Sequence, residues 1–105
     1  AGNPYLVLAA CLAAGLEGLK EKKMPMPNVD KNIFEMTEAE KAAESIEELP
    51  LNLFDAVKEL EADQYICDVL GKHASSKYIE AKYAEWDGYR RQITNWEIDQ
   101  YLYKI

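Results

Sequence analysis

The feature that most limits the possible folds of this chain is an uncharged segment of twelve residues near its start, Tyr5–Leu16. Asn3 and Pro4 precede it and favour a helix start, because Asn can cap a helix and proline suits the first turn, where its missing N–H is not needed. The segment is shorter than the roughly 20 residues that span a bilayer, and it lacks the basic region that opens a signal peptide. We therefore expect a helix over about 4–23 that is buried on most sides inside a larger domain.

A loop and a short acidic helix are expected next. Residues 24–36 contain two prolines, which push the residue before each of them out of helical geometry. The only strand-like residues of the chain lie within this stretch, at 32–35. Thr37 begins a Thr-Glu-Ala-Glu capping-box pattern, which predicts a helix over about 38–48.

Helix starts and stops recur in the second half of the chain. Asn52 can cap one helix, and Asp63 can cap another that closes at Gly71. A longer helix is expected over 73–92, because apolar residues recur along it at helical spacing. Its stripe consists of Ile79, Tyr83, Trp86, Tyr89 or Arg90, and Ile93.

The last twelve residues form a tail whose apolar side chains need another protein surface to pack against. Thr94–Glu97 repeats the capping-box pattern before a run of large apolar residues, and ten residues alone are marginal as a helix in water. We expect an all-α chain of about five to six helices with a Pro-containing loop. Its parts are a buried core helix over 1–23, the loop over 24–36, a helical subdomain over 37–93 and an oligomerisation tail over 94–105.

Charge and residue content exclude several kinds of site. With 12 Lys and Arg against 19 Asp and Glu, the chain lacks the basic face that nucleic acid requires. No glycine-rich phosphate loop is present, and the single histidine, His73, makes neither a nucleophilic triad nor a zinc site. Cys11 and Cys67 stand in apolar surroundings, so we expect buried, reduced thiols and a cytosolic location, with a disulfide between them as the alternative. The glutamates of 38–48 could bind a cation weakly, but a solvated helix face explains them as well.

Several segments resemble glutamine synthetases. Asn3–Leu6, the Ala-rich helix and Gly15–Lys20 are similar to the stretch that follows the last active-site strand in that family, and Val29–Phe34 resembles the loop after it. Glu80–Asp87 and Trp96–Leu102 are similar to the end of the bacterial type I enzymes, particularly the Gram-positive-like division. The resemblance covers essentially the whole chain in the right order.

The resemblance implies a ligase that makes glutamine from glutamate, ammonia and ATP through a γ-glutamyl phosphate, with Mg²⁺ or Mn²⁺. This chain would be the C-terminal part of its α+β catalytic domain, and the start at Ala1 agrees with a piece of a longer protein. The family's catalytic and metal-binding residues would precede Asn3. We therefore expect no catalytic, cofactor or metal site here, an inactive fragment, and a cytoplasmic dodecamer of two hexameric rings when complete.

Three further features follow from the resemblance. Glu85 matches a glutamate that reaches the neighbouring subunit's active site and helps bind inhibitory glutamine, although one more charge on a solvated face is the alternative. Phe34 stands where some type I enzymes carry the tyrosine that is modified with AMP. The tail would dock into a subunit of the opposite ring, with four residues as candidate anchors: Trp96, Ile98, Tyr101 and Leu102.

Two other interpretations remain open. One is a stand-alone helical protein-interaction module without enzymatic activity. The other is a small metal-binding helical protein, which would have to retain a metal through purification. An initiator Met directly before Ala1 would favour the interaction module, whereas a Glu-x-Arg-x-Pro-Asp-like stretch there would favour the synthetase.

Overall fold

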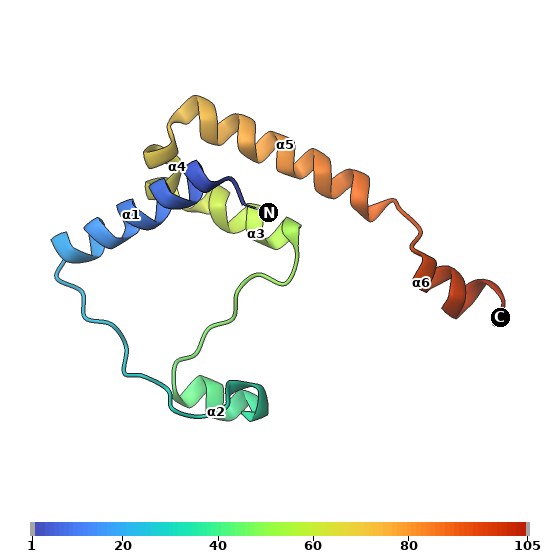
Figure 1. Ribbon diagram of the computed structural model, residues 1–105, viewed down its shortest axis with the longest axis horizontal. Helices are drawn as coiled ribbons and strands as arrows, with labels where there is room; N and C mark the ends of the chain where they lie inside the picture. The colour runs from blue at the N-terminus through green and yellow to red at the C-terminus, as the bar shows by residue number, and fades with distance from the viewer. Residues whose placement is uncertain (1, 105) are drawn as a thin grey trace. The chain divides into compact units, whose positions relative to one another are not determined.

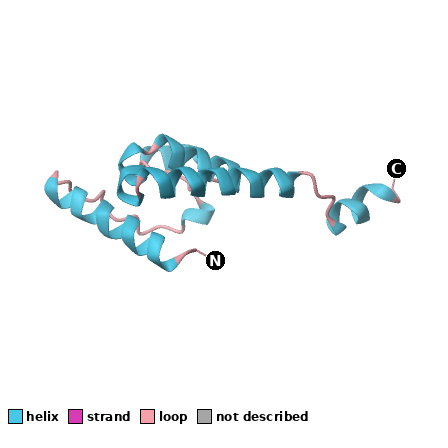
Figure 2. Cartoon of the chain, turned by 90° about the horizontal axis from the view of Figure 1, so that it is seen from above, coloured by secondary structure: helices cyan, strands magenta, loops and turns pink. Residues whose placement is uncertain are grey.

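The first helix of the structure, α1 (Pro4–Lys20), begins where its cap predicts. In this computed structural model, which describes residues 2–104, the Asn3 side chain accepts hydrogen bonds from the backbone N–H groups of Tyr5 at 3.0 Å and Leu6 at 3.3 Å. The described residues are helices and loops without a strand, so the expected all-α class is confirmed (Figures 1 and 2). The chain divides into two units between Leu51 and Asn52, and each is described by itself.

The helix α1 ends earlier than the expected residue 23, for a local reason. Lys22 takes a left-handed backbone conformation with φ 54°. The Lys23 N–H then donates to the Gly18 carbonyl at 3.0 Å, and the Lys22 N–H donates to that of Leu19 at 3.1 Å. This is the Schellman pattern that closes helices, here with lysine where glycine is usual.

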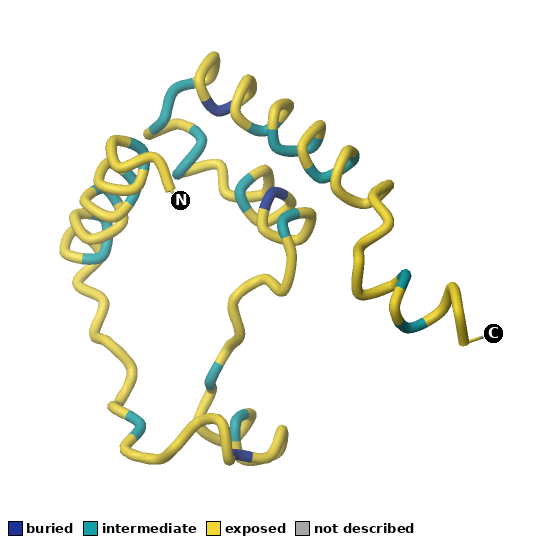
Figure 3. The backbone as a smooth tube through the Cα atoms, turned by 45° about the vertical axis from the view of Figure 1, so that its right-hand side comes forward, coloured by how far each residue is buried: buried dark blue, intermediate teal, exposed yellow. Residues whose placement is uncertain are grey.

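The side chains of α1 are largely exposed, which differs from the burial expected of so apolar a helix. Leu8 is 70% exposed and Leu12 67%, and Figure 3 shows most of the helix in the exposed colour. Cys11 is exposed too, so the expectation of a buried thiol there is wrong for the described residues. The cause is that these residues supply no second apolar layer against α1. Burial of α1 inside a larger domain stays a prediction.

The proline loop contains a turn in place of the strand-like segment. The turn η1 (Ile33–Glu35) is a 3₁₀ helix, so the strand signal at 32–35 was wrong. The Asn32 side chain accepts a hydrogen bond from the Phe34 N–H at 3.1 Å, which bends the backbone locally instead of leaving it extended. Met36, directly after the turn, is one of the few buried side chains of the described chain.

The acidic helix α2 (Glu38–Ala43) starts at its predicted cap but is shorter than expected. Thr37 Oγ1 accepts from the Glu40 N–H at 3.2 Å. Ser45 then takes φ 57°, and the Ile46 N–H donates to the Lys41 carbonyl at 2.9 Å, which closes the helix before residue 48. Lys41 adds ion pairs to Glu38 at 3.7 Å and to Glu48 at 3.3 Å.

Three helices pack together in the second unit: α3 (Leu53–Ala62), α4 (Gln64–Leu70) and α5 (Lys72–Arg90). Asn52 caps α3 and Asp63 caps α4, each through a side-chain oxygen that accepts a backbone N–H. Val57 of α3 is the most deeply buried apolar residue there, at 3% exposed. Cys67 of α4 is half-buried, and its Sγ lies 3.2 Å from the Leu60 carbonyl oxygen, to which it can donate.

The predicted stripe of α5 is covered only in part. Phe54, in the first turn of α3, contacts Tyr83 and Trp86, with ring centroids 6.0 and 6.1 Å apart. The α5 residues after Trp86 therefore run past the start of α3, and Tyr89 remains 62% exposed; Ile93, three residues beyond the end of the helix, is 75% exposed. Helix lengths explain this, since the 10 residues of α3 span about 15 Å and the 19 of α5 about 28 Å.

Gly71 joins α4 to α5 in a conformation that other residues rarely adopt, with φ 94° and ψ 144°. A Cβ at this position would meet no atom within 4 Å, so its cost would be backbone strain alone. We expect Gly71→Ala to lower the free energy of unfolding by about 1–3 kcal/mol in urea denaturation. Gly88→Ala, inside α5 and also without close neighbours, is the matched control and should be stabilising by about 0.5–1 kcal/mol. Equal stability of both variants would contradict the role of Gly71.

Candidate functional site

Glu85 lies on the exposed side of α5 and is paired there with a lysine of the same helix. Lys82 Nζ is 2.9 Å from Glu85 Oε2, and the Glu85 side chain is 60% exposed. The hydrogen bond to Glu85, aided by the charge attraction between the two groups, raises the pKa of Lys82. The same ammonium group lies over the Tyr78 ring, 5.4 Å from its centroid. Glu85 is thus presented to solvent as part of a defined row of side chains.

The opposite side of α5 is the one that anchors the helix. Tyr83 packs on Phe54, and its pKa is raised chiefly by burial, with a hydrogen bond to Glu61 and the negative charge of that carboxylate adding to the shift. Trp86 stacks on Phe54 and contacts Tyr89 at 5.8 Å between ring centroids. This aromatic contact fixes the rotation of α5 about its axis, and therefore the direction in which Glu85 points.

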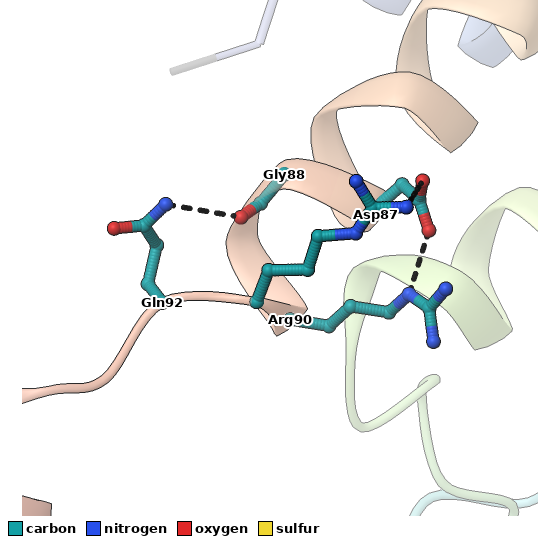
Figure 4. Close-up of polar contacts among 5 residues, drawn as sticks. Asp87, Gly88, Arg90 and Gln92 are labelled. Carbon is teal, nitrogen blue, oxygen red and sulfur yellow. Dashed lines mark hydrogen bonds and ion pairs between the residues drawn. The ribbon is translucent and has the colours of Figure 1, made fainter.

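The end of α5 is held by an ion-pair group (Figure 4). Asp87 pairs with Arg90 at 2.6 Å and with Arg91 at 3.0 Å, and Gln92 donates to the Gly88 carbonyl at 3.4 Å. The hydrogen bond from Arg90 lowers the pKa of Asp87 most; burial opposes this shift, and the positive charges of Arg90 and Arg91 add to it. The group therefore loses its stabilising effect only as the pH falls through this lowered pKa, and it is intact at neutral pH.

The tail is two short helical elements around an open apolar groove. In α6 (Asn95–Glu97) the predicted capping box is complete, with Glu97 N–H to Thr94 Oγ1 at 3.2 Å and Thr94 N–H to Glu97 Oε2 at 3.1 Å. The π-helical turn η2 (Ile98–Leu102) follows directly. Trp96 meets the Tyr101 ring edge-on, with centroids 6.1 Å apart. The groove measures about 650 Å³ and is lined by Ile93, Glu97, Ile98, Tyr101 and Leu102.

The structure thus brings together the four tail residues singled out from the sequence, three in the groove and Trp96 beside it. Tyr101 and Leu102 are about 60% exposed, so the groove is open to a partner.

Phe34 is 99% exposed on its turn, where an enzyme could reach it. Sequence reasoning missed Lys82 and Tyr78, although Lys82 is three residues before Glu85 and Tyr78 is seven before it, which places all three on one helix face.

Residues 2–104 contain neither a cluster of metal-ligating side chains nor a helix that could span a membrane. No three His, Cys, Asp or Glu side chains of residues 2–104 gather as a metal ion would need. No helix in this part of the chain is long and apolar enough to cross a membrane. The resemblance implies a metal-bound nucleotide, but the described residues offer no set of ligands for its metal, and we assign no step that involves it to them.

Comparison with known proteins gives concordant matches. Residues 1–101 match the family described as "Glutamine synthetase, catalytic domain". Glutamine synthetase of Methanococcus maripaludis is 51% identical over 100 residues, and that of Staphylococcus aureus strain MW2 is 46% identical over 103 residues. These alignments cover 95% and 97% of the chain but only 22% and 23% of the relatives. A solved structure described as "Apo GmaS without ligand" matches with a TM-score of 0.73 and 39% identity, over 96% of this chain and 23% of that one.

Proposed function

The chain belongs to the glutamine synthetase catalytic-domain family, and we propose that the complete protein is a ligase that makes L-glutamine from L-glutamate, ammonia and ATP through a γ-glutamyl phosphate. The observation that carries this proposal is the family match over residues 1–101, which leaves almost no part of the chain outside it. ATP and Mg²⁺ or Mn²⁺ would be bound elsewhere in the protein, where the metal would neutralise the transferring phosphoryl group.

Within that enzyme we assign this segment to subunit assembly and feedback regulation. Its open apolar groove suits assembly, and the exposed carboxylate of Glu85 suits a contact with a neighbouring subunit. We further propose that the enzyme is a bacterial type I synthetase of the Gram-positive-like division and is cytoplasmic. The similarity of Glu80–Asp87 and Trp96–Leu102 to that division supports the subtype, and the two free thiols support a reducing compartment.

The full-length gene product tests this function. We expect glutamine formation that requires ATP, ammonia and a divalent cation together, measured by following glutamine and phosphate release. Residues 1–105 expressed alone should give none. Full-length protein without ATP-dependent glutamine formation would overturn the proposal, and turnover by the isolated segment would overturn the role assigned to it.

Phe34 makes a second expectation testable. A phenyl ring has no hydroxyl to accept AMP, so incubation of the full-length enzyme with ATP and an adenylyltransferase should leave the loop peptide unmodified in mass spectrometry. Phe34→Tyr restores the hydroxyl on a turn that is already exposed, and it serves as the positive control. An AMP adduct on the wild-type loop would contradict this expectation.

A further inference from the structure

The contacts of Lys82 distinguish it from the other lysine pair that follows the same spacing on α5. Lys77 also pairs with a glutamate three residues later, but its Nζ is 3.6 Å from Glu80 Oε2, whereas Lys82 lies 2.9 Å from Glu85. The Lys77 side chain is 65% exposed and that of Lys82 only 31%. Of the two lysines, Lys82 is therefore closer to its glutamate and less exposed to solvent.

Two contacts hold Lys82 in place. Its ammonium lies over the Tyr78 ring on one side and donates to Glu85 on the other. Tyr78, Lys82 and Glu85 are spaced four and three residues apart, so they follow one face of the helix. The aromatic ring limits where the ammonium can go, and the ammonium in turn limits where the carboxylate can go.

The pairing leaves Glu85 able to act on a second group. Lys82 contacts Oε2, and a carboxylate can accept bonds at about four lone-pair positions, so Oε1 can still accept a donor from outside the helix. A carboxylate that enters a subunit boundary also loses water, which disfavours it unless a cation accompanies it. Lys82 provides that cation within the same helix.

We propose that Lys82, held by Tyr78, is the positioning residue that orients the Glu85 carboxylate for its contact with the neighbouring subunit and thereby sets the strength of glutamine inhibition. This inference rests on the regulatory role proposed for Glu85. Lys82 itself does not touch the inhibitor; it fixes one carboxylate oxygen so that the other faces outward.

Glutamine inhibition of the full-length enzyme tests the inference. Lys82→Met keeps most of the stem and removes the charge, and we expect it to raise the glutamine concentration for half-inhibition about two- to fivefold, the range that one oriented ion pair of this kind supports. Turnover and the KM for glutamate should not change. Lys82→Arg, which restores a cation, should return inhibition close to wild type. Lys82→Gln is the second uncharged variant if Lys82→Met folds poorly.

Two comparisons separate the possible failures. Lys77→Met removes the weaker pair of the same helix and should leave inhibition unchanged. In a Glu85→Ala background, Lys82→Met should have no additional effect, because the group that it orients is gone. If Glu85→Ala relieves inhibition while Lys82→Met does not, the positioning role is wrong and the role of Glu85 stands. If Glu85→Ala changes nothing, the regulatory proposal itself fails, and the inference fails with it.

Discussion

If the complete protein is the dodecamer of two hexameric rings that its resemblance implies, Leu102→Asp is expected to yield single hexameric rings instead. Leu102 lines the apolar groove of the tail and is 61% exposed in this chain, so its side chain is available to a partner subunit. Burying a leucine contributes about 1.5–3 kcal/mol, and an unpaired carboxylate at the same place costs several kcal/mol more. In the proposed assembly each ring would contribute several tails, so the loss at each one would be multiplied across the interface.

Mass photometry or sedimentation velocity would follow this change directly. Leu51→Asp is the matched control, because Leu51 is also exposed and apolar but lies outside the tail. That variant should remain a dodecamer. An intact dodecamer in Leu102→Asp would show that the tail groove is not the contact between rings, even if the enzyme remained active.

Glu85→Ala is expected to relieve glutamine inhibition while sparing turnover. Its carboxylate is exposed and oriented by Lys82, and loss of one charge-assisted hydrogen bond to an inhibitor weakens binding about tenfold or more. The half-inhibitory glutamine concentration should rise by that factor in steady-state assays, with kcat near wild type.

Glu80→Ala is the control for this substitution. Glu80 is a glutamate on the same helix with its own lysine partner, so its removal causes a comparable loss of charge and of one surface ion pair. Inhibition should stay at the wild-type level in that variant. Equal inhibition in Glu85→Ala and in wild type would contradict the regulatory role of Glu85 and favour the alternative, a charge on a solvated helix face.

Helix starts were the most predictable part of this fold. Asn3, Thr37, Asn52, Asp63 and Thr94 each cap the helix that the sequence assigns to them. A cap depends on one side chain and on N–H groups two or three residues ahead, so all of its parts are adjacent in the sequence. The four tail residues named from the sequence also lie close together, because they belong to one short segment, whereas the groove that three of them line was not predicted.

Helix ends and the geometry around Glu85 were less predictable. Lys22 and Ser45 close their helices in left-handed conformations that glycine and asparagine usually signal, so both helices were expected to run longer. Lys82 could not be singled out from the sequence, because Lys77 stands at the same distance from its own glutamate as Lys82 does from Glu85. Only their side-chain positions show that Lys82 is closer to its glutamate and less exposed.

The sequence by itself determined which segments of this protein are helical, where the helices begin and which side chains form their apolar faces. The tertiary structure decided which of those faces are covered. Val57 is buried because α4 and α5 pack around α3, whereas the leucines of α1 and the last residues of the predicted stripe, Tyr89 and Ile93, stay exposed. The physical reason is that a helix depends on contacts three or four residues apart, while burial depends on a second surface whose residues can lie anywhere in the protein.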